Sequence, residues 1–423
     1  MPAQGDVLSL LVDRPAVGGP MIARVDGQVV LVTGAIPGER VRARIDRVGR
    51  SVAFATAIEV QESSGDRRAG FPDPACGGCV YSHIAYPRQL EIKGQVAVDA
   101  FARIGRLELP APVPVAASRE DGYRMRARLH VRAGRLGFFR EGTHDVCDPR
   151  QSQQLLPETC DALEWLMASA RSLGDVVREV ELSENIAGTA RVVQIETSRP
   201  IDRRALEALA GGDGLTAGPY VTDDFGNGDA PLVVRRHVRA FFQGNRYLIR
   251  HLVDHVVSQV PADGRVLDLY AGAGIFSITA ARRSGATVTA VEGDRHGAAD
   301  LAYNAEREGL SQADSGSRGS RGEVRTIGSD VESFLATRTG DAAFDAAIVD
   351  PPRTGLSPAA LGGLLALAVG RIVYVSCDVA TLARDARKIV DAGYGVASVQ
   401  AFDMFPNTPH VETVVVFDRT LGA

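Results

Sequence analysis

The stretch GRVLDLYAGAG, residues 264–274, decides the fold of this chain. Its apolar run ends in a Gly-x-Gly turn. This is typical of a buried strand that leads into a ligand-binding loop, because glycine lets the backbone approach a ligand and adopt positive φ. From here to residue 391 strand and helix patterns alternate, and two strand patterns, 396–404 and 411–419, close the chain. The alternation predicts an α/β, Rossmann-like domain whose mostly parallel, doubly wound sheet has helices on both faces and an antiparallel edge.

The glycine turn favours a nucleoside over a dinucleotide. Tyr270, Gly272 and Gly274 are followed by Ser277, where a dinucleotide site would have a third glycine. Glu292 stands at the tip of the next strand, where a carboxylate accepts hydrogen bonds from ribose hydroxyls, as in sites for NAD or S-adenosylmethionine (SAM). The chain has no second nucleotide motif, so an NAD-dependent oxidoreductase is disfavoured and SAM is the expected cofactor.

Two further acids follow the next two strands, Asp330 after the third and Asp350 after the fourth. Open α/β sheets bind ligands at the carboxyl ends of their strands, so we expect both acids beside the glycine turn. Asp350 begins an Asp-Pro-Pro tip that is stiff enough to hold a planar base by its polar edge, because proline restricts the residue before it. Arg353 follows the prolines in place of an aromatic residue, which argues against methyl transfer to an exocyclic amine.

Cys377 ends the next buried strand, RIVYVSC (371–377). Free cysteine is often a small apolar filler, but here a cofactor site and a base-binding tip share the same sheet edge, which suggests covalent catalysis on a pyrimidine. A thiolate that adds at C6 of uracil creates an enolate whose C5 can attack the methyl sulfonium of SAM. A base must then remove the C5 proton, and Glu412 on the adjacent edge strand is the candidate. Taken alone, Glu412 fits a solvated strand acid as well.

Before residue 241 the pattern of apolar and polar residues is different. Residues 1–60 alternate apolar and polar side chains between Asp-Gly and Pro-Gly turns, the pattern of an all-β barrel, and 61–74 form a polar linker. Mixed strand and helix patterns predict a central α+β domain over 61–240, followed by a catalytic domain over 241–423. The first 150 residues carry 21 Arg+Lys and 17 Asp+Glu, against 26 and 35 in the rest. A basic front half suits contact with phosphates, although a mixed solvated surface explains it as well.

The motifs resemble, in their order, those of the bacterial RNA uracil-5 methyltransferases, a family with 23S rRNA and tRNA members. They are FFQGN (241–245), LDLYAGAG (267–274), VEGD (291–294), DPPRTGL (350–356), VYVSCD (373–378) and DMFPNTPHVE (403–412). The resemblance spans essentially the whole chain. It implies that Cys377 is the nucleophile and Glu412 the base. It implies a SAM and base pocket lined by Gln243, Tyr270, Glu292, Asp330 and Asp350. Residues 1–60 resemble the TRAM module, an OB-like RNA-binding barrel.

The cysteines depart from the family pattern. Family members with an iron–sulfur cluster have a cysteine six residues before CGGC (76–79) and another beyond a Ser-His-x-Val-Asp stretch. Here Gly70 takes the first place, and the second falls near Ser152. Cys76 and Cys79, with Cys147 and Cys160 in the same domain, could in principle gather around a cluster. Two of them lie off the usual positions, so we expect a CGGC turn without a metal or an iron–sulfur cluster.

The expected substrate is a uridine in RNA, which must be flipped out of its stack to reach a buried pocket. Ribosomal-RNA enzymes of the family usually carry the N-terminal barrel, which favours 23S rRNA over U54 of tRNA. A non-catalytic RNA-binding protein that retains the fold would have lost its nucleophile or base, yet Cys377 and Glu412 are both present. Five cysteines, an odd number, argue against a disulfide framework. With neither a secretory signal nor a long apolar run, we expect a cytoplasmic monomer that makes no membrane contact.

Overall fold

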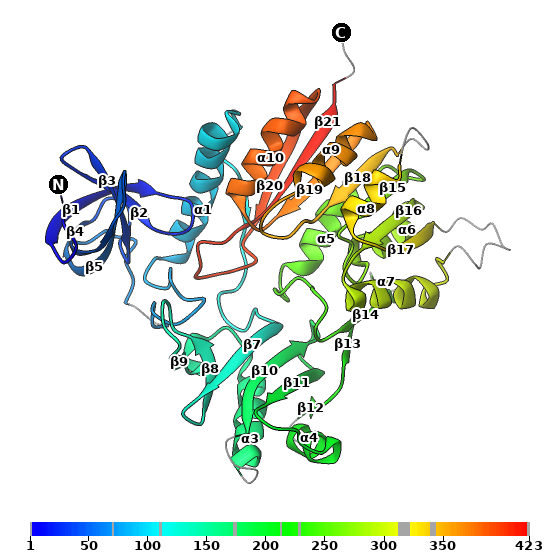
Figure 1. The fold of residues 1–423 in the computed structure, drawn as a ribbon, viewed down its shortest axis with the longest axis horizontal. Helices are drawn as coiled ribbons and strands as arrows, with labels where there is room; N and C mark the ends of the chain where they lie inside the picture. Colours follow the sequence, from blue (N-terminus) through cyan, green and yellow to red (C-terminus); the bar gives the residue numbers. More distant parts are fainter. Residues whose placement is uncertain are drawn as a thin grey trace.

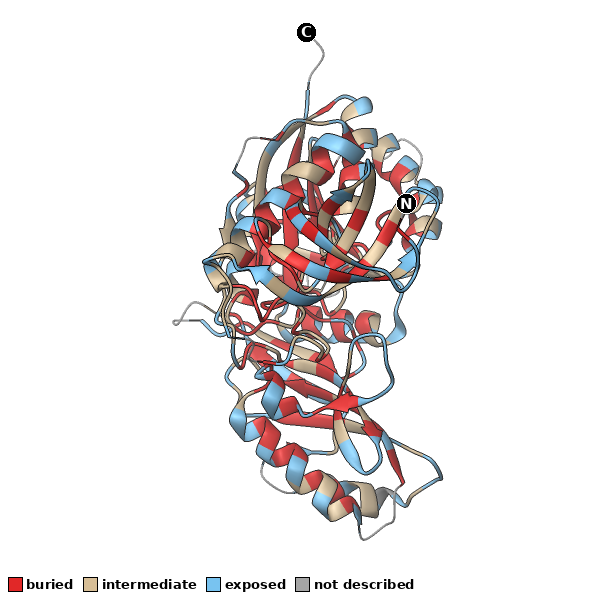
Figure 2. Ribbon diagram, turned by 90° about the vertical axis from the view of Figure 1, so that its left-hand side faces the viewer, coloured by how far each residue is buried: buried red, intermediate tan, exposed pale blue. Residues whose placement is uncertain are grey.

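The computed structural model describes residues 2–69, 72–109, 112–171, 176–211, 214–226, 230–311, 322–338 and 344–420. The ribbon shows a small barrel beside a large sheet with helices, and a second sheet that extends away from both (Figure 1). Colouring by burial shows buried residues along the strands of each part (Figure 2). Within the described residues, no helix has the length and apolar composition needed to cross a bilayer.

The N-terminal residues form a closed five-stranded barrel with the strand order β1-β2-β3-β5-β4. Its strands are β1 (Val7–Pro15), β2 (Met21–Val25), β3 (Gln28–Thr33), β4 (Arg40–Val48) and β5 (Val52–Glu62). In β4 the buried Val41, Ala43 and Ile45 alternate with the exposed Arg42 and Arg44, because successive strand residues point to opposite faces. The expected all-β barrel is therefore confirmed.

The central part is built on a six-stranded sheet of order β12-β11-β10-β7-β8-β9. Its elements are β7 (Arg126–Arg132), β8 (Arg135–Phe139), β9 (Val146–Cys147), α2 (Pro149–Ser152), α3 (Pro157–Ala170), β10 (Val177–Glu184), β11 (Arg191–Thr197), α4 (Arg203–Ala210) and β12 (Leu215–Thr216). Leu163 and Leu166 of α3 join Leu129 and Val180 of the sheet in one apolar core. A hairpin of β13 (Tyr220–Asp224) and β14 (Val233–His237) leads on to the catalytic part.

The catalytic part is an eight-stranded sheet of order β17-β16-β15-β18-β19-β21-β20-β6. Its strands are β6 (Val115–Ala116), β15 (Arg265–Leu269), β16 (Thr287–Glu292), β17 (Glu323–Gly328), β18 (Ala346–Val349), β19 (Arg371–Ser376), β20 (Tyr394–Phe402) and β21 (Glu412–Arg419). Strands β15 to β19 pair in parallel, and β21 is antiparallel to both β19 and β20. This confirms the doubly wound, mostly parallel sheet with an antiparallel edge.

Helices flank this sheet, as Figure 1 shows. They are α1 (Tyr86–Ala100), α5 (Ile249–Ser258), α6 (Ile275–Ser284), α7 (Arg295–Arg307), α8 (Val331–Ala336), α9 (Pro358–Ala366) and α10 (Val379–Asp391), with a π-helical turn (Phe101–Gly105) after α1. α1 comes from the stretch assigned by sequence to the central domain. Ile92 and Ala97 nevertheless share one apolar core with Leu382 of α10, and β6 pairs with β20. We therefore propose that the catalytic domain includes residues 86–116 as well as 241–423.

Candidate active site at the carboxyl edge of the catalytic sheet

A cavity of about 550 Å³ opens at the carboxyl ends of the parallel strands. This volume lies within the range of small-molecule and cofactor sites. The side chains and backbone that line it are those of Phe241, Gln243, Tyr270, Gly272, Glu292, Asp294, Gly297, Asp350, Pro351, Pro352, Arg353, Cys377, Phe405 and Glu412. They come from six separate segments that the sheet brings to one edge.

The turn after β15 forms one wall of this cavity. Tyr270 has a φ of 63° and Gly272 a φ of 55°, which are left-handed values that favour glycine. The Gly272 N–H donates a 2.7 Å hydrogen bond to Glu292 Oε2, and the Asp294 N–H donates one of 2.6 Å to Oε1. A Cβ on Gly297 would lie 3.0 Å from the Glu292 Cγ. Backbone groups therefore fix the Glu292 carboxylate at the cavity wall.

This wall fits the nucleoside part of SAM. An ionised carboxylate has about four lone-pair directions, so Glu292 can accept further hydrogen bonds from two ribose hydroxyls while it holds the loop. Gly272 brings bare backbone to the same wall, and Phe241 and Pro351 supply apolar surface. Gly272 and Glu292, with Tyr270 beside them, line the cavity and could hold SAM; that they bind it stays a prediction.

Asp350 and Gln243 form a polar pair in the same cavity. Gln243 Nε2 donates a 3.2 Å hydrogen bond to Asp350 Oδ2. Desolvation raises the pKa of Asp350 to about 7, and the negative fields of Asp268 and Glu292 act in the same direction. The Asp350 carboxyl can therefore donate or accept a hydrogen bond near neutral pH, and the Gln243 amide offers both a donor and an acceptor. Such a pair suits the N3–H and carbonyl edge of uracil.

The strand register places Cys377 and Glu412 side by side. Ser376, the last residue of β19, pairs with Thr413 of β21, so the next residue of one strand lies opposite the preceding residue of the other. Cys377 is partly exposed to the cavity, and Glu412 is 1% exposed. The antiparallel edge strand thus brings together a thiol and a carboxyl that are 35 positions apart in the sequence.

Burial controls the protonation of both groups. Desolvation, together with the negative field of Glu412, raises the pKa of the Cys377 thiol to about 11. Desolvation raises the pKa of Glu412 well above its usual 4.5, and the charge of Asp350 adds to the effect. Arg353 lies close enough to act in the opposite direction, and it lowers the pKa of both groups. The free protein therefore holds a neutral thiol beside a proton-binding carboxyl, with a guanidinium in place to stabilise the thiolate.

Seven of the nine site residues predicted from sequence line this cavity, and two do not. Gly274 is turned away, and a Cβ at its position would lie 2.6 Å from Leu301 Cδ1. Asp330 is exposed and accepts a 2.7 Å hydrogen bond from the Ser333 N–H as the N-cap of α8. An Asp that follows a strand is also a strong N-cap signal, which the sequence reasoning did not weigh.

The sequence reasoning missed several residues that the structure places at the site. Phe405 and Phe241 line the cavity, and Phe241 is 65% exposed, a large apolar surface at the entrance. Arg353 was used only to exclude amine acceptors. Its place at the end of the Asp-Pro-Pro tip that Asp350 begins was the available signal for a role beside Cys377.

The fold and the site together define a class I, SAM-dependent methyltransferase. A parallel sheet with one antiparallel strand carries a glycine turn, a carboxylate at the tip of the next strand and a reactive pair at the edge. A model of the tRNA (Uracil-5-)-methyltransferase family matches residues 216–420, and a model of the TRAM domain matches residues 3–58.

Relatives match over nearly the whole chain. A 23S rRNA (uracil(1939)-C(5))-methyltransferase of Halomonas elongata is 32% identical over 97% of this chain and 89% of its own. One from Alkalilimnicola ehrlichii is 32% identical over 95% and 94%. The crystal structure of a Pyrococcus abyssi tRNA (uracil-54, C5)-methyltransferase in complex with S-adenosyl-L-homocysteine has a TM-score of 0.73, 24% identity and coverage of 96% and 99%, and so shares the fold. The chain belongs to the RNA uracil-5 methyltransferase family, whose members transfer a methyl group from SAM to C5 of a uridine.

Proposed function

We propose that this enzyme methylates C5 of a uridine in 23S rRNA, with Cys377 as nucleophile and Glu412 as base. The observation that carries the proposal is the register of β19 and β21, which puts the thiol and the carboxyl on neighbouring strands at one cavity. The choice of 23S rRNA is supported by the names of the relatives in Halomonas elongata and Alkalilimnicola ehrlichii, and by the TRAM match.

Each residue of the site has its own role in the proposed methyl transfer. Asp350 and Gln243 hold the polar edge of the uracil, and the Cys377 thiolate, stabilised by Arg353, adds at C6. SAM, when bound, supplies the electrophilic methyl group that C5 takes up. The Glu412 carboxylate then accepts the C5 proton, and the thiolate leaves from C6. A carboxyl whose pKa lies above its ordinary value is a stronger base than a solvated one, which suits this step.

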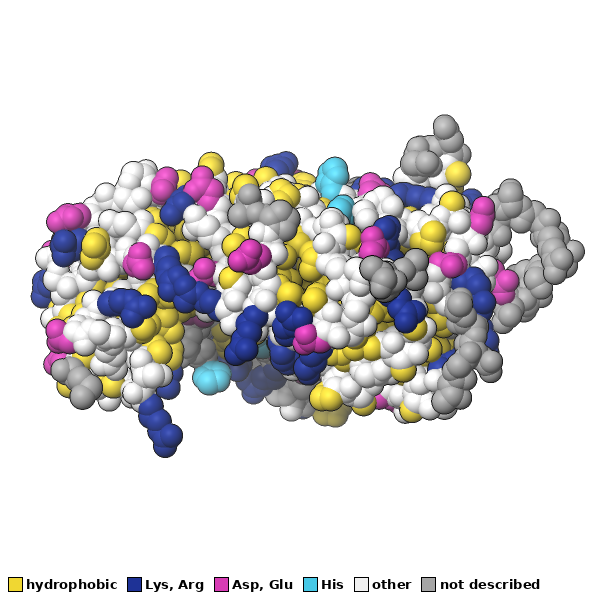
Figure 3. Space-filling view, turned by 90° about the horizontal axis from the view of Figure 1, so that it is seen from above, with side chains coloured by type: hydrophobic (Ala, Val, Ile, Leu, Met, Phe, Trp, Pro, Cys, Tyr) yellow, Lys and Arg dark blue, Asp and Glu magenta, His cyan; other side chains and the backbone are white. Residues whose placement is uncertain are grey.

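The substrate RNA has to present the uridine outside its stack. The exposed ring of Phe241 at the entrance is suited to stack on a base. Seen from above, the molecule carries basic side chains interspersed with acidic and apolar ones (Figure 3). We expect RNA binding to rest on local arginine contacts and the barrel, not on a uniform positive field. We expect the enzyme to act as a monomer in the cytoplasm.

A 5-fluorouridine trap tests the proposal. Fluorine at C5 cannot leave as a proton, so an active enzyme with SAM remains bound to the RNA through sulfur. We expect an adduct that survives denaturation with a fluorinated 23S rRNA fragment and not with fluorinated tRNA. It should map to Cys377, disappear in Cys377→Ala and persist in the control Cys160→Ala. An adduct with tRNA alone would replace the ribosomal assignment, and failure with both RNAs while SAM binds would overturn the mechanism.

A further inference from the structure

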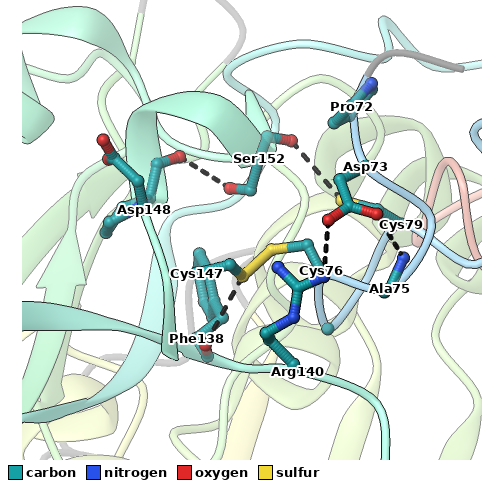
Figure 4. The surroundings of a disulfide bond; sticks show 12 residues. Pro72, Asp73, Ala75, Cys76, Cys79, Phe138, Arg140, Cys147, Asp148 and Ser152 are labelled. Carbon is teal, nitrogen blue, oxygen red and sulfur yellow. Dashed lines mark hydrogen bonds and ion pairs between the residues drawn. A yellow bond between two sulfur atoms is a disulfide. The ribbon is translucent and has the colours of Figure 1, made fainter. Parts of the chain in front are cut away.

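A disulfide joins two distant parts of the chain outside the active site. Cys76 and Cys147 are bonded, with Cα atoms 5.7 Å apart and a separation of 71 positions in the sequence. The bond links the CGGC loop to β9 at the edge of the central sheet (Figure 4). The odd number of cysteines argued against a disulfide framework, and the structure shows a single pair that leaves three of the five thiols free.

Hydrogen bonds hold the two partners in place around the bond. The Gly77 N–H donates to the Phe139 carbonyl at 2.9 Å, and Arg140 Nη2 donates to Asp73 Oδ2 at 2.7 Å. Cys76 forms an isolated antiparallel bridge with Arg140. A Cβ on Gly77 would lie 2.4 Å from the Phe139 carbonyl oxygen, so only glycine allows this close approach. The two segments are therefore in contact over several residues, and the sulfur atoms meet within that contact.

The same region does not fit an iron–sulfur cluster. Cys79 Sγ lies 3.7 Å from the Ser152 carbonyl oxygen, so Ser152 does stand beside the CGGC loop where a fourth ligand was expected. Its hydroxyl donates instead to the Pro149 carbonyl at 2.6 Å. Gly70, at the other expected ligand position, lies outside the described residues. Among the residues that the structure describes, no three Cys, His, Asp or Glu side chains gather as metal ligands.

The two other cysteines of this region, Cys79 and Cys160, pack as apolar side chains. Cys79 and Cys160 are both buried, and both belong to the apolar core of the central part together with Leu155 and Leu163. An apolar core of this kind disfavours the charged thiolates that cluster ligands are. Of the four cysteines, two are therefore paired with each other and two are packed as small hydrophobic side chains.

We propose that the Cys76–Cys147 disulfide takes the structural place of a metal centre in this enzyme, as a covalent clamp between the CGGC loop and the central sheet. Its formation removes two protons and two electrons from the two thiols. A low-molecular-weight disulfide of the cell accepts the electrons and is reduced to two thiols. The clamp closes a long loop, so it stabilises the protein by restricting the unfolded chain.

The residues that follow the CGGC loop connect the clamp to the active site. The Tyr81 N–H donates a 2.8 Å hydrogen bond to the Asn407 carbonyl, in the segment that leads to Glu412. The Tyr81 hydroxyl donates to the Gly19 carbonyl of the barrel at 3.1 Å. Holding the CGGC loop therefore helps to hold the barrel, the central sheet and the catalytic segment in one arrangement.

Counting thiols in the full-length protein tests the clamp. Cells are quenched in acid and the purified, denatured chain is alkylated with and without prior reduction. We expect three of the five cysteines, Cys79, Cys160 and Cys377, to react without reduction, and all five after it. Peptide mapping should assign the protected pair to Cys76 and Cys147. Alkylation of all five without reduction would overturn the proposal.

Thermal unfolding and iron analysis give independent readouts. Reductant should lower the Tm of the wild-type protein and of the control Cys160→Ala, and should leave that of Cys76→Ser/Cys147→Ser unchanged. Protein purified without oxygen should contain no stoichiometric iron or acid-labile sulfide. Iron and sulfide that are present in the wild type and lost in Cys76→Ser would show that a cluster is held here after all, and would overturn the clamp without affecting the methyltransferase assignment.

Discussion

Lys93 on α1 and Asp403, at the start of the segment that leads to Glu412, form an ion pair in which both side chains are wholly buried. Lys93 Nζ also donates to the Phe405 carbonyl at 3.0 Å. One helical turn earlier, Gln89 Oε1 accepts a 3.0 Å hydrogen bond from the Asn407 N–H. Side chains of α1 therefore hold both the Asp403 side chain and the backbone of this segment. Lys93 is thus a positioning residue for the part of the cavity wall that carries Phe405 and Glu412.

Replacing Lys93 should therefore affect both stability and catalysis. Lys93→Met leaves the Asp403 carboxylate buried without its partner, and we expect the free energy of unfolding to fall by about 3–5 kcal/mol. Urea denaturation measures this change. The double variant Lys93→Met/Asp403→Leu should regain much of the loss. Disrupting the more exposed pair Arg88–Glu91 on the same helix should cost less than about 1 kcal/mol. Equal losses of unfolding free energy at the two pairs would contradict the stabilising role of the buried Lys93–Asp403 pair.

Glu412→Gln should allow Cys377 to add to the uracil but should block release of the methylated RNA. The glutamine side chain cannot accept the C5 proton, so the enzyme should add to C6, methylate C5 and then stall with the RNA still attached to Cys377. We expect the turnover rate to fall by about 10²–10⁴-fold, the usual contribution of a general base. Gel electrophoresis under denaturing conditions should show the adduct with ordinary uridine RNA. The double variant Cys377→Ala/Glu412→Gln should give no adduct, and rapid turnover by Glu412→Gln would assign the base elsewhere.

Alkylation of Cys377 by iodoacetamide reports its protonation directly. The free thiol has a pKa of about 11, because it is desolvated beside Glu412. The rate should therefore rise about tenfold per pH unit from pH 8 towards this value, since only the thiolate reacts. Arg353 lowers this pKa, so Arg353→Gln should slow the reaction at every pH in that range. Arg325→Gln, an exposed change on β17, should leave the rate unchanged. A rate independent of pH would show that the thiol is already ionised.

Local pattern was enough to predict most of the fold and much less of the site's surroundings. The strand and the glycine turn at 264–274 and the alternation after it predicted the sheet, because apolar runs and turn residues act locally. The pairing of β6 with β20 was not predicted, since two residues so far from the catalytic sequence carry no periodicity. The Cys76–Cys147 bond depends on two segments meeting in space, which no spacing encodes.

Asp268 should make the stability of the free protein depend on pH. Burial raises its pKa to about 7 from an ordinary value of 3.8. The folded state then binds this proton more tightly than the unfolded chain does. The contribution of Asp268 to the free energy of unfolding is therefore complete below about pH 4 and declines as the pH rises to 7. The loss is on the order of 4 kcal/mol. Relative to the wild type, Asp268→Asn should therefore gain in Tm between pH 4 and pH 8. A difference that does not change with pH would contradict the raised pKa.

Tyr270 tests whether the cofactor turn holds a strained backbone. Its φ of 63° is left-handed, which costs a residue with a Cβ about 1–2 kcal/mol relative to glycine. We therefore expect Tyr270→Gly to unfold with a free energy about 1 kcal/mol higher than Tyr270→Ala, in urea denaturation of the cofactor-free protein. At Tyr220, an exposed residue of a regular strand, the order should be reversed, because glycine weakens a strand. Both variants of Tyr270 lose the same aromatic wall, so their SAM affinities should fall together. If Tyr270→Gly proved the less stable of the two, the turn would be relaxed in solution.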